Sequence, residues 1–120
     1  MKRELKHTAM EGTPTVRFGD KPGCKFVGHI GDSNDTKFGK AYSFTILDGD
    51  APIKRKDEAG TLHDVDVKVG DKVTVFASGQ LLDKLSMAEP GEKIEIEYLG
   101  RKLNPKSGRS FNNWVVNVIE

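Results

Sequence analysis

Two alternating segments near the C-terminus, joined by a basic loop, constrain the fold more than any other feature. Over 92–99, apolar side chains point one way and charged ones the other: Ile94, Ile96 and Tyr98 against Lys93, Glu95 and Glu97. A period of two is typical of a β-strand with one buried face. The segment 111–119 also alternates, with Trp114, Val116 and Val118 sharing one face. We therefore expect two strands of a hairpin here.

The loop between them, over 100–110, contains four cations and no acid; the cations are Arg101, Lys102, Lys106 and Arg109. Its content of Gly, Pro, Asn and Ser indicates a turn. A series of cations can neutralise phosphates, which is how sequence-independent binding to nucleic acids gains affinity. The alternative is a solvated hairpin tip whose charges serve solubility alone.

Shorter segments of the same kind fill the rest of the chain. Alternation predicts strands over 24–30, 40–47 and 72–77, and residues 15–18 fit a further short strand. Leucines at helical spacing predict a helix over 78–88, with Ser78 as its N-cap and a stop at Pro90. By composition, 31–39 is a loop, and 51–70 is a long connection with room for a short strand over 61–69.

The predicted order is five strands with one helix between the third and the fourth. This is the order of an OB-fold, a small Greek-key β-barrel, so we expect the all-β class and a single domain over 1–120. Residues 1–13 are polar and fit either a flexible lead or an edge strand. OB-folds bind oligonucleotides or oligosaccharides on strands 2 and 3 and through the loops 1–2 and 4–5, here 31–39 and 100–110.

Composition excludes several classes of protein. With 19 Lys and Arg against 18 Asp and Glu, the net charge is +1, so only a local cluster can bind a polyanion. The single cysteine, Cys24, excludes an intrachain disulfide, and Cys and His have no metal-ligand spacing. Neither a nucleophile–base pair nor a phosphate loop stands out, so we expect no enzyme, cofactor or metal site. Without an apolar run near ~18 residues or a signal peptide, a cytoplasmic protein and no membrane contact are expected.

A longer pattern covers residues 73–118. A strand and a Leu-rich helix lead into a Pro-Gly pair and Ile-Glu-Ile-Glu-Tyr-Leu-Gly over 94–100, followed by the basic loop and Trp114-Val115-Val116. This pattern resembles the small OB-fold proteins of bacteriophages and prophages, several of which bind single-stranded DNA. The first 70 residues match in layout alone. An acidic tail that recruits partners, which many bacterial-type single-strand binders have, is not implied, because the chain ends at Glu120 just after a strand.

The resemblance implies a non-enzymatic protein that binds single-stranded DNA with little sequence preference, in phage DNA replication or recombination. It would act in the cytoplasm of the host cell, with other replication or recombination proteins as further partners. Because a fold does not fix a function, a protein-interaction or assembly module on the same fold and an OB-type RNA binder remain as alternatives.

Exposed rings are the second requirement, because single-strand binders stack bases on them at about 1–3 kcal/mol per base. Tyr42 and Phe44 share a face with Ile46, which favours the core, whereas Phe76 and Phe111 lie opposite aliphatic faces, which favours exposure. Trp114 is interpreted as a core residue. The complete set of candidate nucleic-acid-binding residues is Lys37, Phe38, Lys40, Tyr42, Phe44, Lys54, Arg55, Lys56, Phe76, Arg101, Lys102, Lys106, Arg109 and Phe111.

Two of these candidate groups have specific alternatives. Phe38 has Lys37 and Lys40 beside it, a pairing suited to stacking plus phosphate contact. The run 54–56 is basic but is followed at once by two acids over 57–58, so self-neutralisation is as good an interpretation as a cationic path.

Overall fold

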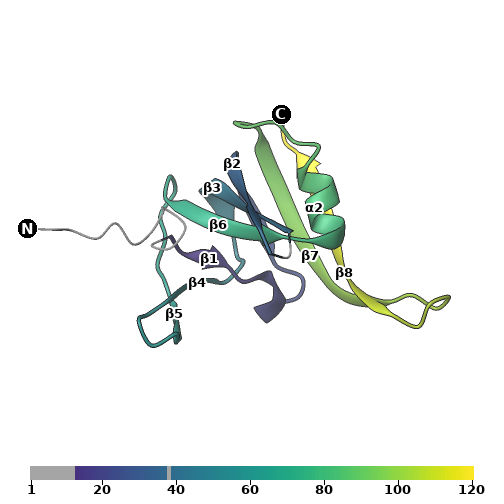
Figure 1. The fold of residues 1–120 in the computed structure, drawn as a ribbon. Coiled ribbons are helices and arrows are strands. Elements are labelled where there is room, and N and C mark those ends of the chain that lie inside the picture. Colours follow the sequence, from purple (N-terminus) through teal and green to yellow (C-terminus); the bar gives the residue numbers. More distant parts are fainter. Residues whose placement is uncertain (1–12, 38) are drawn as a thin grey trace, which may run out of the picture.

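The computed structural model describes residues 13–37 and 39–120 and shows an all-β protein, as the alternation predicts (Figure 1). Within these residues, eight strands form one sheet in the order β5-β4-β1-β6-β3-β2-β7-β8. Their bounds are β1 Thr15–Val16, β2 Lys25–Thr36, β3 Gly39–Gly49, β4 Ile53–Lys56, β5 Leu62–Asp64, β6 Lys72–Ala77, β7 Lys93–Leu103 and β8 Ser110–Val118. β1 and β6 pair in parallel, and the other neighbours are antiparallel.

The helical part of the described chain is small. A 3-10 helix, η1, spans Phe18–Asp20, and the α-helix α2 spans Gly79–Leu85, which is shorter than the predicted 78–88. Ser78 occupies the predicted N-cap position with an extended backbone, although its hydroxyl makes no capping hydrogen bond. Within the described ranges, no helix has the length and apolar character needed to cross a membrane.

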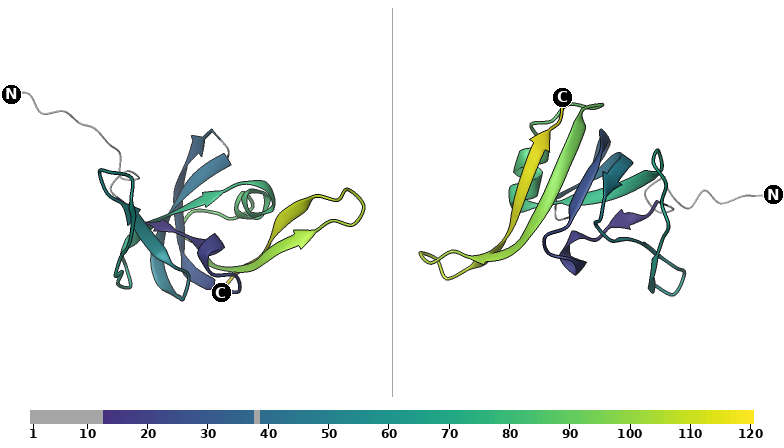
Figure 2. Two further views of the ribbon diagram at one scale, coloured as in Figure 1. Left: turned by 90° about the horizontal axis from the view of Figure 1, so that it is seen from below. Right: turned by 180° about the vertical axis from the view of Figure 1, so that it is seen from behind.

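The core forms where the inward faces of the strands meet α2. The predicted inward residues of β7 are fully buried or nearly so: Ile94, Ile96 and Tyr98. Other core side chains with less than 2% exposure include Phe26, Phe44, Val73, Val75, Leu81 and Leu85. Figures 1 and 2 show the sheet strongly twisted, with α2 between the end of β6 and β8. A period of two therefore gives the correct buried face for these strands.

The hairpin of β2 and β3 differs from the prediction of a loop over 31–39. β2 runs to Thr36 and β3 begins at Gly39, with pairs such as Ser33↔Tyr42 and Asp35↔Lys40. The polar C-terminal end of β2 is exposed. Because it buries no face, its strand conformation requires pairing with β3 but no alternation of apolar residues in the sequence. A Cβ at Gly39 would overlap the carbonyl oxygen of Ala77, so only glycine lets β3 pass β6 this closely.

Three strands extend the sheet beyond β6, and the sequence predicts two of them, β1 and β5, but not β4. β1 stops at Val16, where a strand over 15–18 was expected, because η1 follows at Phe18. β4 lies inside the connection 51–70 and pairs with β1 and β5; β5 is the short strand expected within 61–69. Only Ile53 of β4 is buried, so this strand carries no alternation that a sequence could reveal.

Candidate nucleic-acid interface

The hairpin of β7 and β8 projects from the body of the protein (Figures 1 and 2). Its strands extend to Leu103 and from Ser110, so the loop predicted over 100–110 is confined to 104–109. Every residue from 101 to 112 is exposed, and we call this segment the arm. The arm is therefore a two-stranded ribbon with both faces in solvent.

The tip of the arm is a defined turn. The Asn104 amide N–H donates to the carbonyl of Arg109, and the Gly108 N–H donates to the carbonyl of Asn104, each at 2.8 Å. The Asn104 side chain accepts the Lys106 N–H at 3.0 Å, and Gly108 has φ of +69°, which favours glycine. Backbone geometry thus sets the positions from which Lys106 and Arg109 project.

The charges and rings of the arm fit a polyanion. Arg101 and Lys102 are adjacent in β7 and so point to opposite faces. Lys102 lies directly opposite Phe111, whose side chain is 38% exposed. Within the described residues, none of the four arm cations forms an ion pair. The arm can therefore offer cations to phosphates and one ring to a base.

Trp114 anchors the arm to the body. Its ring lies 4.6 Å from the Tyr98 ring and 5.0 Å from the Phe18 ring, centroid to centroid. The backbone N–H of Trp114 donates to Gln80 Oε1, and its backbone carbonyl accepts from Lys84 Nζ, both at 2.7 Å. Side chains of α2 therefore satisfy the backbone hydrogen-bonding groups of β8 at this point. Trp114 is half-buried and packs against the core from its edge, so its interpretation as a core residue is correct only in part.

Two of the predicted stacking residues lie in the core instead. Phe44 has no exposed surface and packs on Phe26 at 5.4 Å between centroids, and Tyr42 is 5% exposed. Their cross-strand partners in β6 are Val73 and Val75, which are also buried. Neither ring can take a base on its face, so the prediction of stacking is wrong for both.

Lys37 and Lys40 are the predicted phosphate ligands near the β2–β3 turn. Lys37 is exposed, and Phe38 between these cations lies outside the described residues. Lys40 is half-buried and lines a polar hollow with Asp32 and Pro90, beside the end of α2. Lys40 therefore shares this hollow with an acidic residue, although the two form no ion pair within the described part of the chain.

A second concave surface surrounds Phe76, which is 53% exposed on β6. A hollow of about 540 Å³ is lined by Thr13, Thr15, Arg17, Arg55, Lys56, Asp57, Glu58, Leu62 and Phe76. We call it the Phe76 groove. Thr15, Arg17 and Phe76 also line an adjoining hollow of about 210 Å³ that reaches Phe18 and Trp114. The structure brings together candidates that the sequence placed in separate groups.

Arg17, Leu62 and Trp114 are lining residues of these hollows that sequence reasoning missed. For Arg17 a signal was present, because Thr15 and Arg17 alternate with the buried Val16 and Phe18. For Leu62 no local signal exists, because it reaches the groove through the pairing of β4 with β5.

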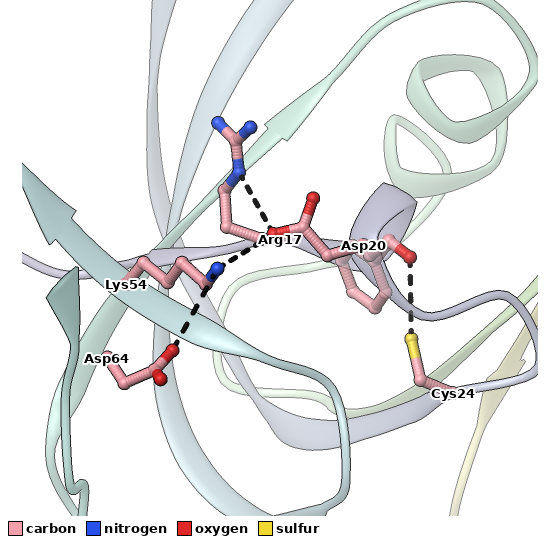
Figure 3. Close-up of polar contacts among 6 residues, drawn as sticks. Arg17, Asp20, Cys24, Lys54 and Asp64 are labelled. Carbon is pink, nitrogen blue, oxygen red and sulfur yellow. Dashed lines mark hydrogen bonds and ion pairs between the residues drawn. The ribbon is translucent and has the colours of Figure 1, made fainter. Parts of the chain in front are cut away.

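Ion pairs neutralise one of the predicted phosphate ligands. Lys54 Nζ lies 3.4 Å from a carboxylate oxygen of Asp20 and 3.9 Å from one of Asp64 (Figure 3). Arg17 reaches Asp20 only through Nε, at 3.9 Å. Arg55 and Lys56 form no ion pair within the described part of the chain. Self-neutralisation therefore applies to Lys54, although through acids other than the expected 57–58.

Asp57 closes the turn between β4 and β5. Its carboxylate lies 2.7 Å from His63 Nε2 and accepts the N–H groups of Ala59 and Thr61, each at 2.9 Å. These hydrogen bonds, that of His63 first, hold the pKa of Asp57 below its usual value of 3.8. The wall of the Phe76 groove is thus fixed by an ionised carboxylate.

The first prediction concerns acid stability. Because folding lowers the pKa of Asp57, its ionised form stabilises the fold above its unfolded-state pKa, and this contribution is lost as pH falls through the folded-state pKa. Asp57→Asn should lower the melting temperature near neutral pH and flatten its decline below about pH 4. Thermal unfolding of parent, variant and the neighbouring control Glu58→Gln over about pH 2 to 7 checks this. An acid decline as steep in Asp57→Asn as in the parent would contradict it.

The arm and the Phe76 groove each combine an exposed ring with exposed cations. Within 13–37 and 39–120, no cluster of three or more His, Cys, Asp or Glu side chains is arranged to hold a metal ion. Comparison with protein-family models, curated proteins and solved structures found no match to this chain.

Proposed function

We propose that this protein binds single-stranded DNA with little sequence preference and acts in phage DNA replication or recombination. The observation that carries the proposal is the arm, where four exposed cations without a neighbouring acid accompany the exposed ring of Phe111. In this mechanism the cations neutralise phosphates of the strand, and a base stacks on Phe111. Neither contact reads the edge of a base, so binding depends little on sequence.

The strand order supports an OB-fold-like barrel as the scaffold. Taken along the chain, β2, β3, β6 and β7 lie in the spatial order β6-β3-β2-β7, the arrangement of a Greek key. β8 pairs with β7, and α2 comes between β6 and β7, where an OB-fold has its helix. On this scaffold the arm takes the place of the loop between strands 4 and 5, which is one of the binding loops of that fold. The strands β1, β4 and β5 are then an addition to it.

A titration with three ligands tests the proposal. Oligo-dT, oligo-rU and a duplex of the same length are each titrated at two salt concentrations. We expect oligo-dT to bind more tightly than the duplex and to weaken steeply with salt, because phosphate contacts release counterions. Tighter binding of oligo-rU would favour the RNA-binding alternative. No binding of any of the three at low salt would favour the protein-interaction module.

A further inference from the structure

We propose that the Phe76 groove is a second contact site for the same strand and holds one nucleotide unit, with its base on Phe76 and its phosphate at Arg55 and Lys56. This inference rests on the proposed function. It assigns to β1 and to the β4–β5 hairpin, which lie outside the five strands of the OB-like order, a direct role in binding. The arm and the groove would then hold two points of one strand.

The ring of Phe76 is placed to receive a flat partner. Its neighbours in β6 are buried, with Thr74 at 1%, Val75 at 0% and Ala77 at 3% exposure, whereas Phe76 is 53% exposed. Leu62 of β5 also lines the groove, so the β4–β5 hairpin contributes an apolar side chain to the same hollow as Phe76. The volume of about 540 Å³ lies within the range of small-molecule sites.

Two cations of the groove have no acidic partner within the described residues, and two nearby carboxylates are already engaged by other groups. Asp20 is engaged by Lys54 and Arg17, and Asp57 by His63 and two backbone N–H groups. Arg55 and Lys56 have no acidic partner within the described residues, and only Glu58 among the lining acids is likewise unpaired there. Two unpaired cations next to an exposed ring fit a phosphate next to a base.

A single strand fits this site better than a duplex does. Bases of a duplex are stacked within the helix and cannot place a free face on Phe76, whereas a single strand can turn one base outward. The adjoining hollow shares Thr15, Arg17 and Phe76 with the groove, so the surface continues toward Trp114, which packs on Tyr98 near the base of the arm. A strand could therefore run from the groove toward the arm.

Two linked contacts have a measurable consequence. A strand long enough to touch both sites binds the second one intramolecularly, at a high effective concentration, so its affinity exceeds that for either site alone. A strand that is too short engages only one site. The affinity for oligo-dT should therefore rise sharply with length, and the rise should require both the arm and the groove.

The test compares short and long oligo-dT, of about 5 and about 20 nucleotides, one near the lower limit of the usual OB-fold site and one beyond its upper limit. The chain has one tryptophan, and Trp114 lines the hollow next to Phe76, so its fluorescence reports on the groove. We expect short oligo-dT to quench Trp114 in the parent. We expect Phe76→Ala, and separately Arg55→Ala with Lys56→Ala, to abolish this quenching and to weaken long oligo-dT roughly tenfold or more. The variant lacking the four arm cations should retain the quenching by short oligo-dT.

Two control variants show whether an effect is specific to the groove, and two results would contradict the inference. Phe76→Tyr keeps a ring and should bind like the parent, and Lys25→Ala with Lys93→Ala removes two exposed cations outside the groove and should change affinity little. If the folded groove variants bind both lengths like the parent while the arm variant loses all binding, the strand lies on the arm alone, and this inference fails while the proposed function stands. If the parent binds no single strand at low salt, the proposed function fails as well.

Discussion

Replacing Arg101, Lys102, Lys106 and Arg109 together with Ala is expected to weaken binding to single-stranded DNA and to flatten its dependence on salt. Each phosphate neutralised on a single strand contributes about 0.7 to the slope of log affinity against log salt concentration. If two to four of these cations contact phosphates, the slope should fall by roughly 1.5 to 3. Titrations at several salt concentrations measure this directly.

The same substitution should leave the fold intact. All four side chains are exposed and unpaired within the described residues, whereas the turn at the tip is held by hydrogen bonds of Asn104 and by Gly108. The melting temperature should therefore change little. A matched control exchanges each Arg for Lys and each Lys for Arg, which keeps the charge and should keep the slope. An unchanged slope in the folded alanine variant would place binding elsewhere, at 37–40 or 54–56 and the Phe76 groove.

Alternation of apolar and polar residues predicts those strands that have one buried face. β6 begins and ends at the predicted residues, and Ile94, Ile96 and Tyr98 of β7 point inward as expected. The core interpretation of Tyr42 and Phe44 was available from their shared face with Ile46, and the structure agrees with it rather than with stacking. In β7 and β3, burial of one face imposes a period of two that the sequence must carry. In β6 the period is imperfect, because Thr74 is buried along with Val73 and Val75.

Strands and sites that form only through pairing with distant segments of the chain leave no alternation in the sequence. The outer end of β2 and most of β4 are exposed, so their strand conformation comes from partners that are distant in the chain. The extension of β7 to Leu103 has the same origin, since it pairs with β8 and not with the core. The Phe76 groove is the clearest example of a site that the sequence does not predict, because its lining comes from β1, β6 and the β4–β5 hairpin. Only long-range topology places these side chains together.

Trp114→Ala is expected to be among the most destabilising single substitutions in the arm and its base. The indole packs edge-to-face on Phe18 and at a tilt on Tyr98, and aromatic pairs add to the stability gained from burial alone. Because Trp114 is half-buried, the loss should lie at the lower end of the range for Trp→Ala, about 3 kcal/mol of the free energy of unfolding. The hydrogen bonds to Gln80 and Lys84 use the Trp114 backbone and are retained in the variant.

Phe76→Ala provides the contrast that tests this assignment of faces. Its side chain lies on the solvent side of β6, so its removal should change the free energy of unfolding by less than about 1 kcal/mol. Denaturant unfolding followed by circular dichroism compares parent and both variants, because the fluorescence of the single tryptophan is lost in one of them. If Trp114→Ala unfolded at the denaturant concentration of the parent and Phe76→Ala at a much lower one, the two rings would have exchanged roles. Phe76 would then stabilise the core, and the groove would have no free ring for a base.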